Sequence, residues 1–198
     1  EKEEDKGASA NVAETERRLG PVEILVCNHG IGSAHEKVIW EQDPAVWEES
    51  LRVNLDGPFH LSRLVVRGMV QRGYGRCVYT SSTAARTAEH AGSAYNSSKA
   101  GLLGLMRSVA QDGGPHNVTA NAVLPGWVRT EMAERSARAE AQRRGITPEE
   151  VWAERGKLCP PGRVVTPREV AEVIAFFASE ESGGVSGEAI AVALGGIW

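Results

Sequence analysis

Residues 22–30 read VEILVCNHG, an almost unbroken apolar run that ends in a polar turn with a glycine. Strands that are buried on both faces of a parallel sheet have such continuous apolar runs, whereas half-exposed strands alternate apolar and polar residues. We therefore expect residues 22–27 to form a buried parallel strand that is followed by a turn. Similar runs lie at residues 76–80, 118–123 and 189–194.

Helical segments lie between these apolar runs. Asp43-Pro44 predicts a helix start, since Asp caps helix N-termini and Pro suits the first helical position. A longer helix is predicted over residues 94–111, because glycines and a proline at residues 113–115 stop it. Capping boxes predict two more helix starts, at Thr147 and Thr166. Strands that alternate with helices indicate an α/β fold with a parallel sheet.

The composition excludes several classes of function. The chain has 198 residues, enough for one domain with a sizeable core. Its net charge is −4, with acids and bases interspersed, so no surface for nucleic acid is predicted. It has no run of 18 apolar residues and no signal peptide, so we expect a cytoplasmic protein that does not span a membrane.

The three cysteines and five histidines predict no metal site. Cys27, Cys77 and Cys159 are separated by 50 and 82 residues, which fits no metal-binding or redox spacing. The histidines are scattered and form no pattern of metal ligands. Cys27 and Cys77 lie within apolar runs, so we expect both to be small buried hydrophobic residues.

The predicted helix over residues 94–111 carries two polar residues on its apolar side. Tyr95 and Lys99 are one turn apart, and Leu102 and Met106 continue the same side. An inward-facing lysine is costly unless polar groups satisfy it. Two interpretations follow. In one, the tyrosine ring packs beside a snorkelling lysine. In the other, the ammonium lowers the pKa of the phenol, which then serves as a general acid–base.

Asn54 lies beside an apolar stripe on the helix that starts near Asp43. Four residues later, Pro58 has no N–H for the Asn54 carbonyl, and its ring clashes with that carbonyl. Gly57 adjoins Pro58, so a kink or break is expected here. The freed carbonyl then needs another donor. An ordered water is one choice, and a helix break with a solvated carbonyl is the other.

The order of these residues resembles that of the short-chain dehydrogenase/reductase family. Residues 95–101, YNSSKAG, are similar to the family's YxxxK signature, and Ser82 stands 13 residues before Tyr95, where the family has its catalytic serine. Residues 24–30 resemble its strand and NNAG segment, with Cys27 and His29 replacing Asn and Ala. The other matching stretches are residues 53–55, 121–130 and 161–187.

The resemblance covers nearly the whole chain from Val22 onward and implies a Rossmann-like doubly wound parallel sheet with helices on both faces. It also implies an NAD(P)-dependent oxidoreductase that interconverts a secondary alcohol and a ketone, with NAD or NADP as cofactor. By position, Tyr95 would exchange a proton with the substrate oxygen, which Ser82 would orient. Lys99 would hold the nicotinamide ribose and lower the pKa of the tyrosine. Asn54 would anchor a water in a proton relay to Lys99.

The same resemblance implies further contacts to the cofactor. Asn28 and Gly30 would shape the floor of its site, and the nicotinamide end would meet Pro125, Gly126, Val128 and Thr130. His29 is expected to be a turn residue with local hydrogen bonds, and the alternative is a contact to substrate or cofactor. Residues 193–196, ALGG, differ from the family's usual Asp-Gly-Gly, so subunit contacts there are expected to differ.

One part of the family's pattern has no counterpart in this sequence. The family's fold starts with a strand and a glycine-rich TGxxxGxG turn, which receives the pyrophosphate. We therefore expect residues 1–198 to form a single domain that is incomplete at its N-terminus, with residues 22–27 as an uncovered apolar edge. Three explanations stay open: a sequence that lacks an N-terminal part, a short paralogue that pairs its edge with another chain, and a non-functional fragment.

The resemblance implies a mobile substrate lid over residues 130–160. It also points to the segment between Ser82 and Tyr95 as a place where the family often contacts its substrate. The candidate substrate contacts are Glu89, His90, Trp127, Met132 and Trp152, and ordinary packing between lid helices is the alternative for the lid residues. A medium-sized ketone or secondary alcohol is expected, with 3-oxoacyl, 3-hydroxy-acid and polyketide-like ketones all open.

The helices at residues 43–72 and 94–111 are those through which family members pair into dimers and tetramers. Their outward faces hold few charges near Leu103 and Ser108, so a homotetramer or homodimer is expected. The rival hypothesis is a binding or oligomerisation module that kept the fold without activity, and the complete tetrad argues against it. Lyase or epimerase chemistry is a second rival, and the presence of Lys99 argues against its dehalogenase-like version.

Overall fold

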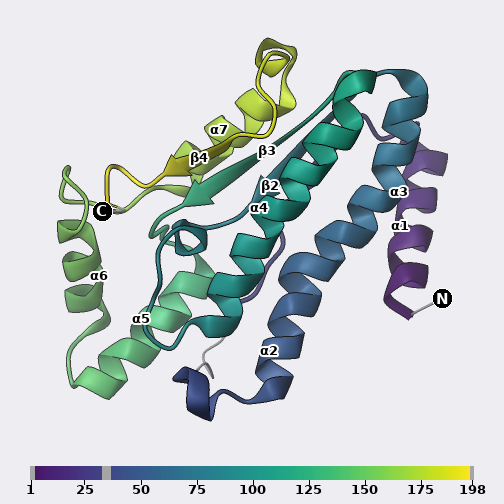
Figure 1. The fold of residues 1–198 in the computed structure, drawn as a ribbon. Helices are drawn as coiled ribbons and strands as arrows, with labels where there is room; N and C mark the ends of the chain where they lie inside the picture. The colour runs from purple at the N-terminus through teal and green to yellow at the C-terminus, as the bar shows by residue number, and fades with distance from the viewer. Residues whose placement is uncertain (1–2, 33–36, 197–198) are drawn as a thin grey trace.

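The computed structural model describes residues 3–32 and 37–196 (Figure 1). Four parallel strands form one sheet in the order β1-β2-β3-β4. Their neighbours in the sheet are also their neighbours in sequence, so each crossover moves one place along the sheet. The strands are β1 (Ile24–Cys27), β2 (Gly75–Thr80), β3 (Val118–Pro125) and β4 (Ala189–Val192).

Helices follow and precede the strands as the sequence predicts. The α-helices are α1 (Glu3–Leu19), α2 (Pro44–Leu51), α3 (Gly57–Arg72), α4 (Ser93–Gly113), α5 (Glu131–Arg144), α6 (Pro148–Lys157) and α7 (Pro167–Ala178). A π-helical turn, η2 (Arg52–Asp56), joins α2 to α3, and short 3-10 turns are η1 (Ile39–Glu41), η3 (Thr83–Ala85), η4 (Gly114–His116) and η5 (Glu180–Ser182).

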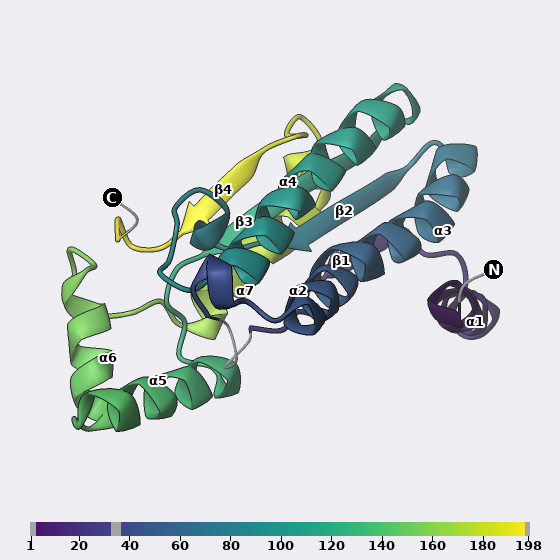
Figure 2. The ribbon, with the colours of Figure 1, turned by 60° about the horizontal axis from the view of Figure 1, so that its bottom comes forward.

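The sheet is covered on both faces, which confirms the predicted architecture. Helices α3 and α4 lie on one face, α7 lies on the other, and α1 packs against α3 (Figures 1 and 2). The larger core is formed by alternate residues of the strands with α3 and α4, and includes Met69, Tyr79 and Met106. The smaller core lies under α7 and contains Val78, Val123 and Phe177.

Strand β1 lies at the edge of the sheet, as expected for an uncovered apolar run. Leu25 and Cys27 point into the core, whereas Ile24 and Val26 are 46% and 40% exposed on the opposite face. The strand begins two residues later than the predicted residue 22, because the Val22 carbonyl accepts a hydrogen bond from the Arg72 side chain instead of a ladder donor.

Helix α4 corrects one expectation about its outward face. Ser108 is exposed as expected, but Leu103 is only 5% exposed and belongs to the core. The buried side of α4 is wide because it meets β3, α2 and α3 together. Leu103 therefore packs inward beside Leu102.

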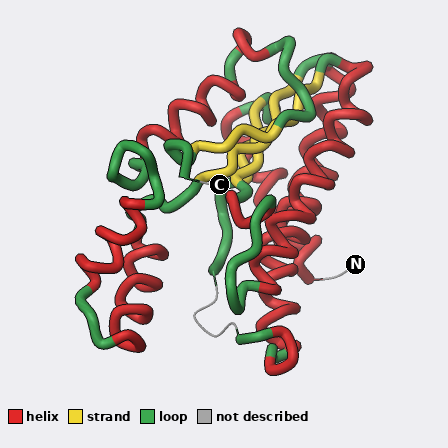
Figure 3. The backbone as a smooth tube through the Cα atoms, turned by 60° about the vertical axis from the view of Figure 1, so that its left-hand side comes forward, coloured by secondary structure: helices red, strands yellow, loops and turns green. Residues whose placement is uncertain are grey.

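Helices α5 and α6 stand apart from the strands (Figure 3). They pack against each other around a small core of their own, made of Ala137, Ala141, Val151 and Trp152. Thr147 caps α6 through the predicted capping box, and Thr166 caps α7 in the same way. No helix in the described part of the chain is long and apolar enough to cross a membrane.

Candidate active site

The predicted site residues gather at the carboxyl ends of β1, β2 and β3, where open parallel sheets bind their ligands. The loops that follow β1 and β2 meet the N-terminal half of α4 there. Residues from distant parts of the sequence thus reach one edge of the sheet.

Tyr95 and Lys99 share one side of α4 with core residues. Tyr95 is half-buried, Lys99 is 4% exposed, and Leu102 and Met106 are fully buried. The Lys99 Nζ lies 5.8 Å from the centre of the Tyr95 ring. The predicted juxtaposition of phenol and ammonium is therefore present.

The Lys99 ammonium is held in a costly place. Within the described residues, its Nζ donates one hydrogen bond, to the Thr80 carbonyl at 3.0 Å. Burial lowers the pKa of Lys99 to about 8. The nearby Cys27 does not balance the charge at neutral pH, since burial raises the pKa of that thiol to about 12. An ammonium has three protons, so two remain for a bound ligand.

The end of β2 is tied to α4 and to the loop after β1. Ser81 Oγ donates to the Lys99 carbonyl at 2.8 Å, and Thr80 Oγ1 donates to Asn28 Oδ1 at 2.9 Å. Ser82 follows and caps η3, with its Oγ accepting from the Ala84 N–H at 3.2 Å. Ser82 thereby begins η3, the short turn that packs against α4.

Asn54 lies within the π-helical turn that replaces the predicted kink. The Gly57 N–H bonds to the Arg52 carbonyl five residues back, because Pro58 offers no N–H to Asn54. The Asn54 side chain is fully buried. Its Oδ1 accepts from the Ile31 N–H at 2.7 Å, and its Nδ2 donates to the Ile31 carbonyl at 2.9 Å and to Ser98 Oγ at 3.0 Å.

These contacts make Asn54 a clamp between the loop after β1 and α4. The Asn54 amide bonds to both the N–H and the carbonyl of Ile31. Ser98, which accepts from the same amide, donates in turn to the Tyr95 carbonyl at 2.8 Å. The sequence predicted a role for the Asn54 main chain, through its carbonyl. Its side-chain amide was also expected to need partners, and the structure identifies them as Ile31 and Ser98.

Gly30 and His29 fit closely around this cluster. A Cβ at Gly30 would lie 2.9 Å from Lys99 Nζ and 3.1 Å from Asn54 Oδ1, so a larger residue would displace them. A Cβ at Gly57 would lie 2.9 Å from His29 Nε2. Burial and the Lys99 charge lower the pKa of His29, and a hydrogen bond to the Val53 carbonyl opposes them. The His29 ring thus meets the helix that carries Asn54, rather than its own turn.

The loop after β3 contains the remaining predicted cofactor residues. Pro125 ends β3, and Gly126 approaches the loop after β4 so closely that a Cβ would lie 3.0 Å from the Ala193 Cβ. Val128 forms a bridge to Val165, while Thr130 Oγ1 caps α5 by accepting from the Ala133 N–H at 3.4 Å. Pro125, Gly126 and Val128 are half-buried, and Thr130 is exposed.

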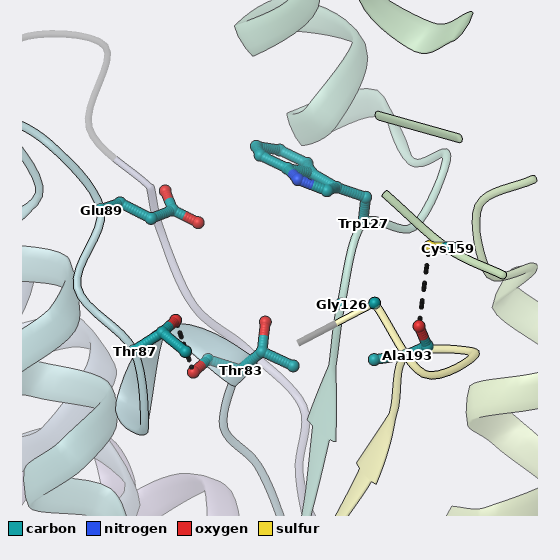
Figure 4. Close-up of a pocket in the computed structure, with 8 residues that line it drawn as sticks. Thr83, Thr87, Glu89, Gly126, Trp127, Cys159 and Ala193 are labelled. Carbon is teal, nitrogen blue, oxygen red and sulfur yellow. Dashed lines mark hydrogen bonds between the residues drawn. The ribbon is translucent and has the colours of Figure 1, made fainter. Parts of the chain in front are cut away.

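A pocket of about 250 Å³ opens beside this loop (Figure 4). Two predicted substrate contacts face each other across it, since the Glu89 carboxylate points toward the Trp127 indole. Of the other six lining residues, Gly126 was predicted as a contact to the nicotinamide end, and no other was predicted as a contact. The six are Thr83, Thr87, Gly126, Cys159, Ala193 and Gly196.

The other predicted substrate contacts lie elsewhere. His90 is exposed and Met132 is 42% exposed, and neither lines this pocket. Met132 instead faces the loop after β1, since its sulfur would lie 3.5 Å from a Cβ at Gly32. Trp152 is buried in the core between α5 and α6, where its Nε1 donates to Glu134 at 3.1 Å. Its position matches the alternative of ordinary packing between lid helices.

Arg155 is a buried charge near the pocket that sequence reasoning missed. It is 5% exposed, and its guanidinium carbon lies 3.6 Å from the centre of the Trp127 ring and 4.9 Å from that of Trp152. The spacing of Trp152 and Arg155 places them on neighbouring sides of α6, but nothing local predicts the contact to Trp127.

Comparison with known proteins accounts for this arrangement. A family model described as Enoyl-(Acyl carrier protein) reductase matches residues 3–196. An acetoacetyl-CoA reductase of Rhizobium meliloti is 36% identical over 180 residues, which is 90% of this chain and 69% of the relative. The chain belongs to the short-chain dehydrogenase/reductase family. The matching relatives include reductases and a dehydrogenase, and this protein is an NAD(P)-dependent oxidoreductase.

Solved structures of short-chain dehydrogenases/reductases share the fold. An actinorhodin polyketide ketoreductase variant with NADPH superposes with a TM-score of 0.91 at 31% identity, over 96% of this chain and 74% of that one. An NAD+-bound xylitol dehydrogenase superposes with a TM-score of 0.88 at 26% identity, over 96% of this chain and 74% of that one. The two neighbours thus carry the two forms of the cofactor, and NAD or NADP is the cofactor class of this oxidoreductase.

The described residues fit the nicotinamide end of such a cofactor. Lys99 offers buried ammonium protons for ribose hydroxyls, and Gly30 has no side chain to displace that ammonium. Asn28 is exposed, and its Oδ1 is fixed by Thr80. No glycine-rich strand-to-helix turn for the pyrophosphate occurs among residues 3–32 and 37–196. The fit of the described residues therefore concerns the nicotinamide and ribose end of the cofactor.

Proposed function

We propose that this oxidoreductase interconverts a secondary alcohol and a ketone through a tetrad of Asn54, Ser82, Tyr95 and Lys99. The observation that carries the proposal is the buried Lys99 ammonium, one helical turn from Tyr95 and with protons free for a ligand. A positive charge that is this deeply buried lowers the stability of the fold, so stability alone does not explain it. A neighbouring phenol and a ribose diol are groups that its charge and protons would serve.

In this proposal, Tyr95 holds and moves the proton at the substrate oxygen. The Lys99 charge favours the phenolate form of Tyr95, so that the phenol can give a proton to a forming alkoxide and take it back in the reverse direction. Ser82 donates a hydrogen bond to the same oxygen and orients it. NAD(P)H, when bound, supplies the hydride to the carbonyl carbon.

Asn54 would hold the loop after β1 in place and complete a proton relay to Lys99. Its clamp on Ile31 keeps Gly30 against the Lys99 ammonium, which supports this assignment. Its main-chain carbonyl lies in the π-helical turn, where the usual helix donor is missing, and an ordered water is a fitting partner for it.

We further propose that residues 1–198 act as one domain in which residues 130–160 form the substrate lid. The separate packing of α5 and α6 supports this assignment. The substrate would be a medium-sized ketone or secondary alcohol in the pocket between Glu89 and Trp127. The names of the relatives keep 3-oxoacyl, 3-hydroxy-acid and polyketide-like ketones as candidates.

A homotetramer or homodimer built on α3 and α4 completes the proposal. Gly104 and Ser108 are exposed on α4, so another helix could approach this side closely. Sedimentation velocity tests this assembly, and a clean monomer at micromolar concentration would contradict it.

The test of the tetrad is the substitution Tyr95→Phe in the full-length protein. Oxidation of NADH or NADPH is followed by absorbance with ethyl acetoacetate as the ketone. Because the phenol hydroxyl moves the proton, kcat should fall by about 10²–10⁴-fold. Tyr74→Phe, a half-buried tyrosine that stacks on Arg76 away from the site, is the matched control and should leave kcat unchanged. A Tyr95→Phe rate within a few-fold of wild type would refute the assignment.

A further inference from the structure

Trp127, which forms one wall of the pocket, is in contact with the buried guanidinium of Arg155. Arg155 stacks on one face of the Trp127 indole, with its guanidinium carbon 3.6 Å from the ring centre. Trp127 also lines the pocket opposite Glu89 (Figure 4). With one face covered by Arg155, the indole offers its opposite face and its edge to a bound molecule.

Arg155 is held in this place by three hydrogen bonds to α5. Its Nη2 donates to Glu140 Oε2 at 2.9 Å and to Ser136 Oγ at 3.3 Å, and its Nη1 donates to the Ala133 carbonyl at 3.4 Å. All three acceptors lie on α5. The planar guanidinium is thereby fixed in orientation as well as in position, which a flexible ammonium would not achieve.

The Arg155 side chain is too buried to be explained by the ion pair alone. It is 5% exposed, and its Nε has no hydrogen-bond partner among the described residues. Burial of an incompletely satisfied guanidinium costs free energy. Its Glu140 partner already has an exposed arginine, Arg144, whose Nη1 lies 2.8 Å from Glu140 Oε1. The lid therefore has an ion pair on Glu140 without Arg155. What Arg155 adds are its two weaker hydrogen bonds to α5 and its contacts to the rings of Trp127 and Trp152, of which the Trp127 contact is the closer.

The stack also joins two parts of the molecule. Trp127 follows β3 and belongs to the loop at the active site, whereas Arg155 lies on α6 of the proposed lid. The small core between α5 and α6 ends at Trp127, which packs against it. The Arg155–Trp127 stack therefore connects the lid directly to the pocket wall.

We infer that Arg155 is a positioning residue that fixes the Trp127 indole as a flat wall of the substrate pocket. Pockets with such a wall favour ketones whose ring or branched skeleton packs on the indole, over short-chain ketones that do not reach it. That a ketone occupies this pocket rests on the proposed function. That Arg155 fixes Trp127 rests on the contacts of the described residues alone.

The first test compares KM and kcat for two neutral ketones, the bicyclic 2-tetralone and the small butanone. Arg155→Met keeps the length of the side chain but removes the charge and the planar stack, and it should raise KM for 2-tetralone by about tenfold. It should leave kcat, and KM for butanone, within about twofold, since the tetrad is untouched. Arg155→Lys should fall between wild type and Arg155→Met, because it keeps the charge but loses the plane.

Arg144→Met is the matched control. Arg144 pairs with the same Glu140 but is exposed and has no contact to Trp127 among the contacts of the described residues. It should leave KM for both ketones unchanged. An equal rise in KM for Arg144→Met and Arg155→Met would show that only the stability of the lid matters, and would overturn the inference.

The second test needs no turnover. Quenching of Trp127 fluorescence by acrylamide is obtained as the difference between each protein and its Trp127→Phe counterpart. Release of the indole from Arg155 should raise the quenching constant of Trp127 by about twofold or more in Arg155→Met and leave it unchanged in Arg144→Met. An unchanged constant in Arg155→Met would overturn the inference. If wild type reduces neither ketone, the proposed function fails, and quenching still decides whether Arg155 holds Trp127.

Discussion

Lys99 shows how one residue sets the balance between stability and chemistry at this site. Its ammonium is 4% exposed and bonds to the Thr80 carbonyl. The protein thus keeps a charge where an apolar residue would pack better. Sites of this kind commonly gain stability when the functional group is removed.

The pH dependence of stability follows from the lowered pKa of Lys99. The pKa is about 8 in the folded chain against 10.5 for an ordinary lysine, so the unfolded chain binds more protons between these values. Because of this group, the free energy of unfolding therefore increases as the pH rises from about 8 to 10.5. Below about pH 8 the cost of the buried charge is fully present, at about 3 kcal/mol.

Lys99→Met should accordingly stabilise the cofactor-free protein at neutral pH by about 1–3 kcal/mol, and the gain should vanish toward about pH 10. Urea unfolding at several pH values measures it. Lys157→Met, which removes an exposed lysine of α6, controls for the change in net charge. A gain that stays constant with pH would mean that Lys99 is not the titrating group.

Glu89 gives the pocket a negative wall. Burial raises the pKa of its carboxyl, Arg155 lowers it, and Glu140 raises it again. The carboxylate should disfavour anionic substrates, so Glu89→Gln should lower KM for acetoacetate by about threefold to tenfold and leave KM for its neutral ethyl ester nearly unchanged. In wild type, the KM for acetoacetate divided by the KM for its ethyl ester should decrease as the pH is lowered, because Glu89 becomes protonated. Equal effects on both substrates would contradict this reading of the pocket.

Sequence reasoning reached the residues whose spacing within one helix is informative. Tyr95 and Lys99 were predicted because a phenol and an amine occur on a face that otherwise carries Leu102 and Met106. Arg155 was not predicted, since its partner Trp127 is 28 residues away and on another element. Contacts of this kind depend on tertiary packing, which no local pattern encodes.

At the scale of elements, the π-helical turn between α2 and α3 positions the site. It contains one residue more per turn than an α-helix, and it places Asn54 where its amide reaches Ile31 and Ser98. The cause is local, because Pro58 removes one donor from the helix.

Pro58→Ala returns the missing N–H and lets the segment relax toward an α-helix. We expect kcat to fall by about tenfold, because Asn54 shifts from its partners. The free energy of unfolding should change by less than about 1 kcal/mol, since the new hydrogen bond offsets the lost packing of the ring. Pro44→Ala at the start of α2 is the control for losing a proline and should leave kcat unchanged. An unaltered kcat in Pro58→Ala would show that the π-helical turn is not needed for the reaction.

Elements with strong end signals were predicted closely. Asp43, Thr147 and Thr166 cap the helices that they were expected to cap. Strand ends were predicted less closely, because they depend on pairing with the neighbouring strands. β3 runs to Pro125 since it pairs with both β2 and β4, whereas β4 stops at Val192 before Leu194, which has a left-handed φ of 53°.

At the scale of the molecule, α5 and α6 have few ties to the sheet. They surround their own small core, and Trp127 connects it to the loop after β3. Units with little shared core open before the rest of a protein unfolds. We expect the lid to be such a unit.

Native-state hydrogen exchange measures this expectation. Backbone amides of α5 and α6 should exchange with opening free energies at least about 2 kcal/mol below those of β2 and β3. Helix α4, which packs on the sheet, is the control and should behave like the strands. A common opening free energy for α4, α5 and α6 would mean that the lid unfolds only with the whole chain.

The overall architecture was predictable from the alternation of apolar runs and helices, because each crossover of a parallel sheet needs a helix between strands. The placement of α5 and α6 was not predictable. Their capping residues fix where they begin, whereas their distance from the sheet depends on single side chains such as Trp127 and Arg155.

The extra residue of the π-helical turn also limits how this chain can change in length. Removing one amino acid between Arg52 and Asp56 would shorten this turn by one residue and rotate everything before it by about 100° relative to α3. Asn54 could then no longer meet Ile31 and Ser98 together. Single-residue deletions, which surface loops tolerate, should therefore be selected against in this segment even where every remaining side chain is kept.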